Sequence, residues 1–248
     1  MNKLTIAAAQ TGAEKGDIET NVRTHCEFTK TAIKNEVDII IFPELSLTGY
    51  EPDIVRENTM DLHDKRLLPL KKLVRDFGIT IVAGAPVPCP SEKPYLGALV
   101  LHPENSFIYL KQHLHTGEEQ YFSSVPDRSG HVVTVKDEKI GIAICADVEH
   151  ASHPAAAAFS GATIYAAGVL MLGGYANAAK QMQQYAKTHQ MAALMADYGS
   201  PTGGYIPAGQ SAIWDANGDL IAVAGKNGDA LVVGMKINEK WQGKVVRL

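Results

Sequence analysis

The sequence contains few cysteines, no long apolar run and no excess of positive charge. The three cysteines among its 248 residues, Cys26, Cys89 and Cys145, have no paired spacing, so we expect no disulfide framework and a protein of the reducing cytoplasm. No apolar run reaches the roughly 18 residues that span a membrane. A formal net charge of −4 and a pI near 6.1 offer no basic face for nucleic acid.

The sequence also lacks the signals of export and of division into domains. Its first residues enter an apolar, strand-like run directly, without the apolar core of a signal peptide. No linker rich in proline, glycine or serine interrupts the chain. With 46% hydrophobic and 20% charged residues, it has the composition of a globular protein with a sizeable core. We expect residues 1–248 to form a single domain, the last dozen being either part of it or a C-terminal extension.

Strand-like and helix-like apolar patterns alternate along the chain. β-branched runs predict strands, and apolar stripes at spacings of three and four predict helices, with Asp17 beginning the first helix and Gly78 ending the second. The mixture of alternation and hairpins predicts one α/β domain in which two sheets pack together with helices outside. Strands are predicted at 4–10, 37–42, 80–85, 96–101, 106–110, 132–135, 140–145, 163–167, 191–196, 211–214, 220–224 and 230–235, and helices at 17–35, 67–77, 154–160 and 176–189.

Three reactive side chains stand at the C-terminal ends of predicted strands: Glu44, Lys111 and Cys145. Open α/β sheets place their chemistry at this edge. If these strand ends meet, the carboxylate can take the thiol proton and later activate water, while the ammonium stabilises the thiolate and an oxyanion. Taken singly, each residue has an ordinary structural explanation, because free cysteines are commonly buried and charged residues at strand ends are commonly solvated.

The sequence around these three residues resembles the nitrilase superfamily of carbon–nitrogen hydrolases. The matching blocks are Ile-Phe-Pro-Glu-Leu-Ser-Leu-Thr-Gly-Tyr at 41–50, Tyr-Leu-Lys-Gln-His-Leu at 109–114 and Gly-Ile-Ala-Ile-Cys-Ala-Asp at 141–147. They occur in the family's order of glutamate, lysine and cysteine. The resemblance implies a four-layer α-β-β-α sandwich. It also implies a homodimer or a higher homo-oligomer, because relatives usually pair through the outer helices.

The resemblance implies a role for each matched residue. Cys145 would attack an amide-type carbon to form a thioester, and Glu44 would act as general base and acid. Lys111, together with the backbone N–H of Ala146, would stabilise the tetrahedral intermediate. No cofactor and no metal is implied. Nitrile-hydrolysing relatives typically have Trp-Glu after the cysteine, so the Ala-Asp of this chain argues against a nitrile substrate, and we expect Asp147 to hold the turn rather than to react.

A second carboxylate of the family lies after the lysine and ahead of an aromatic pair. This chain offers two adjacent glutamates in that place, Glu118 and Glu119. We place on Glu118 the role of orienting Lys111 and raising the basicity of the site, and keep Glu119 as the alternative.

The nine histidines suggest two further kinds of site. A metal site would need a third or fourth ligand at a suitable spacing, and none is evident. A papain-like pair would join Cys145 to His150 or His189, but it would leave the glutamate and the lysine without a purpose. The closely spaced histidines are His113 with His115 and His150 with His153.

The function implied by the resemblance is a cofactor-free, thiol-dependent amidohydrolase. It would cleave a non-peptide C–N bond of a small linear amide or N-carbamoyl compound and release ammonia or an amine. An acyltransferase, in which an amine resolves the thioester, and a non-catalytic binding or regulatory module with the same fold stay open as alternatives. The substrate is not identified, because its selection depends on the loops at 50–60, 117–128 and 172–175.

Overall fold

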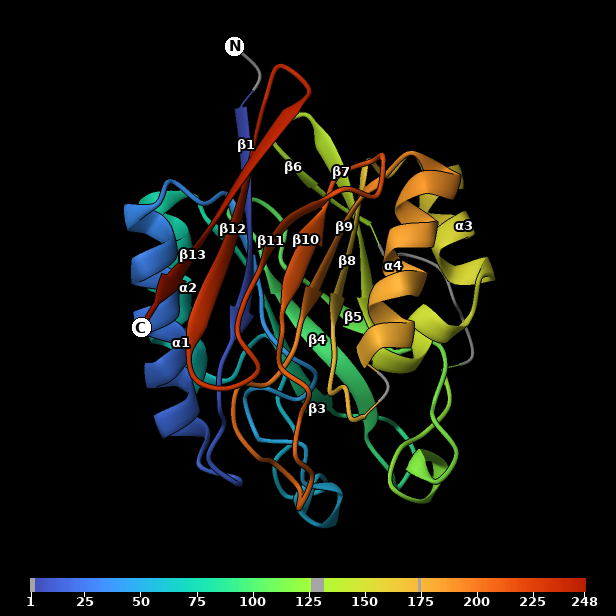
Figure 1. The fold of residues 1–248 in the computed structure, drawn as a ribbon. Coiled ribbons are helices and arrows are strands. Elements are labelled where there is room, and N and C mark those ends of the chain that lie inside the picture. Colours follow the sequence, from blue (N-terminus) through green and yellow to red (C-terminus); the bar gives the residue numbers. More distant parts are fainter. Residues whose placement is uncertain (1–2, 126–131, 174) are drawn as a thin grey trace.

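The structure, a computed structural model, describes residues 3–125, 132–173 and 175–248. Two β-sheets pack face to face, and helices cover the outer face of each sheet (Figure 1). The predicted four-layer sandwich is therefore confirmed. Within these ranges no helix combines the length and the hydropathy that a bilayer span requires. Arg128 and Gly174, which belong to two of the loops expected to select the substrate, lie outside the described residues.

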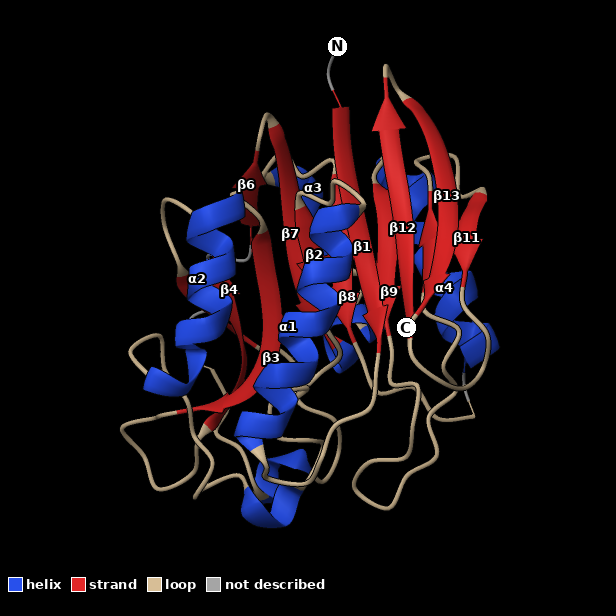
Figure 2. Cartoon of the chain, turned by 90° about the vertical axis from the view of Figure 1, so that its left-hand side faces the viewer, coloured by secondary structure: helices blue, strands red, loops and turns tan. Residues whose placement is uncertain are grey.

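Local residues set where the helices begin and end. The side chain of Asp17 caps α1 by accepting a hydrogen bond from Thr20 N, and Gly78 ends α2 with a left-handed φ of 69°, as predicted. Figure 2 shows α1 and α2 lying across the first sheet, while α3 and α4 cover the second (Figure 1). The α-helices are α1 (Ile18–Lys34), α2 (Leu68–Phe77), α3 (Ser152–Phe159) and α4 (Tyr175–His189), and the 3₁₀ helices are η1 (Pro52–Ile54), η2 (Lys65–Leu67), η3 (Glu118–Gln120) and η4 (Cys145–Glu149).

The first sheet has the strand order β13-β12-β1-β2-β3-β4-β5. Its central strands β1, β2 and β3 pair in parallel, and the remaining neighbours pair in antiparallel fashion. β2 is a run of three buried isoleucines, as expected for a strand covered on both faces. The strands are β1 (Lys3–Gln10), β2 (Ile39–Ile41), β3 (Thr80–Val87), β4 (Tyr95–Leu101), β5 (Phe107–Leu110), β12 (Ala230–Ile237) and β13 (Lys240–Arg247).

The second sheet has the strand order β11-β10-β9-β8-β7-β6. Here β7, β8 and β9 pair in parallel, with antiparallel strands on both sides. The two sheets therefore share one plan, in which the parallel strands lie at the centre and hairpins at the edges. The strands are β6 (Val132–Val135), β7 (Glu138–Ile144), β8 (Ile164–Gly168), β9 (Ala192–Ala196), β10 (Ala212–Trp214) and β11 (Leu220–Val223).

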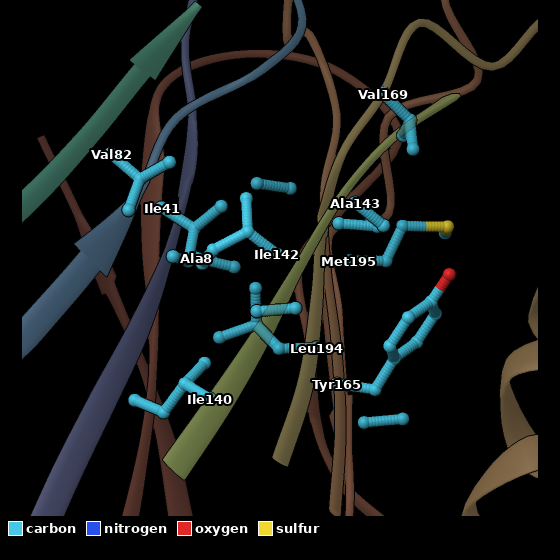
Figure 3. Close-up of a cluster of buried hydrophobic side chains, with 14 of the residues drawn as sticks. Ala8, Ile41, Val82, Ile140, Ile142, Ala143, Tyr165, Val169, Leu194 and Met195 are labelled. Carbon is cyan, nitrogen blue, oxygen red and sulfur yellow. The ribbon is translucent and has the colours of Figure 1, made fainter. Parts of the chain in front are cut away.

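The core between the sheets follows the two-residue period of the strands. In Figure 3, Ile142 and Leu194 of the second sheet point toward Ile41 of the first, whereas the next residues along, Ala143 and Met195, lie on the other side. All five side chains are buried. Such a register fixes the position of each strand end, because a slip by one residue would exchange the two faces.

The last residues of the chain differ from the sequence expectation. The sequence shows no apolar periodicity from residue 237 onward, yet β13 pairs with β12 along its whole length. Most side chains of β13 are exposed or only partly buried. An edge strand that buries so little has no need of an alternating apolar pattern, which is why the sequence alone does not reveal it.

Candidate active site

The residues predicted from the strand ends lie together in the structure. Lys111 Nζ is 2.7 Å from Glu44 Oε1 and 2.8 Å from Glu118 Oε2, and all three side chains are buried. Glu44, Glu118 and Cys145 line one cavity of about 480 Å³. The glutamate and the lysine come from the first sheet, and the cysteine follows β7 of the second. The site is therefore formed where the two sheets meet.

Glu44 lies in a loop that passes close to the backbones of both sheets. A Cβ atom at Gly84 would come within 2.2 Å of Leu45 N, and one at Gly168 within 2.4 Å of Phe42 O, so only glycine leaves room for this loop. Tyr198 donates a hydrogen bond of 2.7 Å to the backbone carbonyl of Glu44. These contacts hold the glutamate at the base of the cavity.

The two carboxylate oxygens of Glu44 have different surroundings. Oε1 accepts a hydrogen bond from Lys111, whereas Oε2 is buried and accepts no hydrogen bond with good geometry from the residues that the structure describes. Burial raises the pKa of Glu44 to about 7, because the repulsion from Glu118 adds to it and the attraction to Lys111 only partly offsets it. A carboxyl group with this pKa can both accept and return a proton near neutral pH.

Lys111 is held as an ammonium by its two carboxylate neighbours. Burial alone would lower its pKa, but the charges of Glu44 and Glu118, and the hydrogen bond to Glu118, outweigh that effect and raise the pKa above its ordinary value. The side chain thus supplies a fixed positive charge. The backbone N–H of Lys111 donates to Leu96 O, which continues the β4–β5 hairpin and fixes where the side chain starts.

Of the two adjacent glutamates, Glu118 is the one that contacts the lysine. Its oxygens accept hydrogen bonds from Lys111 Nζ at 2.8 and 2.9 Å, from Tyr50 Oη at 2.8 Å and from His115 N at 2.8 Å. Glu119 is exposed and accepts a hydrogen bond from Gly117 N. The geometry agrees with the role placed on Glu118, which remains a proposal. Tyr50 belongs to the first motif block, but the sequence gives no sign that it reaches Glu118.

Cys145 stands at the sharp junction between β7 and η4. Its φ of 42° lies in the left-handed region, which costs a non-glycine residue about 1–3 kcal/mol. Burial raises the pKa of the thiol, and the negative charge of Glu44 adds to this more than Lys111 opposes it. The resting thiol therefore keeps its proton and needs a neighbouring base. Ala146, whose backbone N–H is predicted to stabilise an oxyanion, follows directly within η4.

His115 Nε2 lies 3.3 Å from Cys145 Sγ. The sequence suggested His150 or His189 as the partner in a papain-like pair, but His150 stacks on His113 and His189 packs on Tyr185. Predicting that His115 contacts the thiol would have required knowing the path of the loop after Lys111. No local sequence pattern indicates that path. Within the described parts of the chain, no three acidic, histidine or cysteine side chains are grouped so that they could hold a metal ion.

Asp147 connects the segment that carries the cysteine to the segment that carries the lysine. Its oxygens accept hydrogen bonds from Ile144 N at 3.0 Å and from Gln112 N and His113 N at 3.0 and 2.9 Å. Tyr109 also donates its hydroxyl proton to this carboxylate. The expectation that Asp147 holds the turn is therefore confirmed by its contacts, and these contacts also reach the strand end at Lys111.

Solved structures share this architecture over almost the whole chain. The amidase from Nesterenkonia sp. AN1, solved as a mutant in complex with butyramide, has a TM-score of 0.84 at 22% identity and covers 93% of this chain and 89% of its own. Saccharomyces cerevisiae Nit3, a member of branch 10 of the nitrilase superfamily, has a TM-score of 0.85 at 19% identity, with coverages of 94% and 89%. The fold is that of the nitrilase superfamily.

The family follows from the sequence. The carbon–nitrogen hydrolase family model matches residues 5–238, and the chain belongs to this family. Curated relatives include the glutamine-dependent NAD(+) synthetases of Thermotoga maritima, 28% identical over 162 residues, and of Xanthomonas campestris, 30% identical over 152 residues. These matches cover 63% and 58% of this chain but only 28% and 27% of the relatives, so the matched segment spans little more than a quarter of the relatives' length.

Proposed function

We propose that the chain hydrolyses a non-peptide carbon–nitrogen bond of a small amide through a thioester on Cys145. The observation that carries this proposal is the buried cluster of Glu44, Lys111 and Glu118, whose two carboxylates line the same cavity as a free cysteine. The cluster supplies a proton acceptor, a fixed positive charge and a group that orients that charge. Acyl chemistry at a thiol needs the first two.

The first half of the reaction forms the thioester. Glu44 Oε2, which no described residue engages in a hydrogen bond, takes the thiol proton while Sγ bonds to the amide carbon and the carbonyl electron pair moves to oxygen. Lys111 and the backbone N–H of Ala146 stabilise the oxyanion. When the intermediate collapses, the C–N bond breaks and Glu44 passes the proton to the departing nitrogen, which leaves as ammonia or an amine.

The second half releases the acid. Glu44, ionised again, takes a proton from water as the water oxygen bonds to the thioester carbon. The C–S bond then breaks, and the proton returns to the sulfur. Glu118 holds Lys111 in place through both halves by two hydrogen bonds. A pKa of about 7 for Glu44 suits a group that must both accept and donate protons.

The cavity supports a small linear amide or N-carbamoyl compound as the substrate. Its walls include Leu170, Met171 and Leu172 from the loop after β8, together with Tyr121 and Tyr205. A volume of about 480 Å³ lies at the lower end of the range for small-molecule sites. The Ala-Asp pair after the cysteine adds the expectation that nitriles are poor substrates.

The proposal includes a homodimer in the cytoplasm. Phe159, at the end of α3 on the outer face of the sandwich, is 95% exposed, which is unusual for a side chain of its size. A second copy packed through the outer helices would cover it. Sedimentation or light scattering of the wild type and of Phe159→Ser should show a dimer that the substitution weakens, and a monomeric wild type would contradict the proposal.

The decisive experiment is a liberated-ammonia screen across aliphatic amides, ω-amides, N-carbamoyl compounds and nitriles. The active compound should leave an acyl adduct on Cys145, detectable by intact mass, and Cys145→Ala should abolish turnover while Cys89→Ser, which changes another free thiol, should not. Full activity of Cys145→Ala, or turnover that iodoacetamide does not inhibit, would overturn the mechanism. Measuring free carboxylate against acyl-amine product separates hydrolysis from acyl transfer.

A further inference from the structure

His115 contacts the nucleophile Cys145 but has no role in the proposed mechanism. His115 Nε2 is 3.3 Å from Cys145 Sγ, and the histidine lines the same cavity. Its backbone N–H is held by Glu118, and its Nδ1 lies 3.8 Å from Glu149 Oε2. The backbone of His115 is therefore held by Glu118 of η3, and its ring lies between Cys145 Sγ and the carboxylate of Glu149 on η4.

We propose that His115 is a further catalytic residue, which accepts the thiol proton of Cys145 as a second base beside Glu44. This role rests on the proposed thiol chemistry. The S–H bond breaks, an Nε2–H bond forms, and the electron pair stays on sulfur, so the product is a thiolate beside an imidazolium. In this route the imidazolium supplies the proton that the departing nitrogen takes when the C–N bond breaks, and the proton that Glu44 takes from water returns to sulfur when the C–S bond breaks.

The neighbours of the ring favour this direction of transfer. The carboxylate of Glu149 on the Nδ1 side favours the tautomer with its proton on Nδ1, which leaves the Nε2 electron pair facing the sulfur. The side chain of Glu149 is 57% exposed and that of His115 is 35% exposed, so solvent reaches this pair. The ring can therefore exchange its proton with water.

The other charged groups around the thiol set the balance between the two bases. Glu44 and Glu118 share the single positive charge of Lys111, so the cluster of these three carries one net negative charge when both carboxyl groups are ionised. An imidazolium at the cavity wall offsets this charge. The buried thiolate then has a positive group on His115 as well as the buried ammonium.

The rate at which iodoacetamide alkylates Cys145, followed by intact mass across the pH range, tests this role without an amide substrate. Cys89→Ser serves as the background, because hydrogen bonds, Ser91 first among them, outweigh burial and lower the pKa of Cys89 to about 7. In the Cys89→Ser background, His115→Gln and His115→Asn should slow the alkylation of Cys145 near neutral pH by ~10-fold or more. The rates should converge with the parent at high pH, where the thiol ionises without a base.

The control is His102→Gln, which makes the same change in the turn between β4 and β5, at the opposite end of β5 from Lys111. It should leave the alkylation rate unchanged. Melting temperatures identify any variant that has lost its fold, and two replacements at His115 guard against that loss. Alkylation within twofold of the parent at all pH values would overturn the role, as would a loss of the same size at every pH.

The alkylation assay also separates this role from the proposed function. If the wild type hydrolyses no amide but His115→Gln still loses thiol reactivity only near neutral pH, the amidase proposal fails and the second base stands. If the wild type hydrolyses amides and both His115 variants match it in turnover and alkylation, the second base fails and the amidase proposal stands.

Discussion

Replacing Asp147 by alanine should destabilise the protein more than any change at an exposed turn. The carboxylate is fully buried and accepts hydrogen bonds from three backbone N–H groups, those of Ile144, Gln112 and His113. The acceptor is ionised, because hydrogen bonding and charge from its histidine and tyrosine neighbours overcome burial and lower its pKa. These bonds join the strand end that carries Cys145 to the one that carries Lys111.

The size of the effect follows from the number of donors left without a partner. A buried donor that loses its acceptor costs about 1–3 kcal/mol, so the three backbone N–H groups give roughly 3–9 kcal/mol for Asp147→Ala, while the Tyr109 hydroxyl keeps His153 Nε2 as a partner at 2.9 Å. A domain has roughly 5–15 kcal/mol of stability in total. In Asp147→Asn the amide oxygen can still accept from Gln112 and His113, while its NH₂ faces the N–H of Ile144, so one donor is lost at about 1–3 kcal/mol.

The matched control is Asp215→Ala. One oxygen of Asp215 accepts hydrogen bonds from the backbone N–H groups of Asn217 and Asp219, but both donors lie in an exposed turn where water can replace the carboxylate. Its cost should stay below about 1 kcal/mol. Urea denaturation followed by circular dichroism measures all three variants. If Asp147→Ala were no more destabilising than Asp215→Ala, the clamping role of Asp147 would be refuted.

Three further outcomes are expected from the contacts and pKa values of buried carboxyl groups. Glu118→Gln should lower kcat by ~10-fold or more, because Lys111 loses its orienting charge, whereas Glu119→Gln should stay within about twofold in the same ammonia-release assay. Since Glu44 must be ionised to take the thiol proton, kcat/KM should rise with pH through about 7, and a flat acidic limb would contradict its role as base. Burial raises the pKa of Asp197 from 3.8 to about 8, so the wild type loses stability as pH rises between these values. The melting temperature of Asp197→Asn relative to the wild type should therefore increase from acidic to alkaline pH, and a constant difference would refute this assignment.

The sequence predicted best what depends on short stretches of chain. The runs before Glu44 and Lys111 are apolar over several residues, so both the strands and their ends are visible locally. The end of α2 at Gly78 follows from a single residue that tolerates a left-handed backbone. The edge strand β13 escaped prediction because burial, which creates a readable pattern, is slight there.

Contacts between the two sheets cannot be predicted from short stretches of sequence, and the candidate site is formed by such contacts. Glu44 reaches the cavity only because Gly84 and Gly168 let its loop pass between the sheet backbones, and nothing in the local sequence around either glycine indicates what approaches it. Asp147 and His113 are 34 positions apart, and His115 and Cys145 are 30 apart. The strand-end positions of Glu44, Lys111 and Cys145 predicted only that these three groups meet. The contacts of Asp147 with the segment after Lys111, and of His115 with Cys145 Sγ, depend on how one sheet is positioned against the other. That position is set by the packing of the whole core.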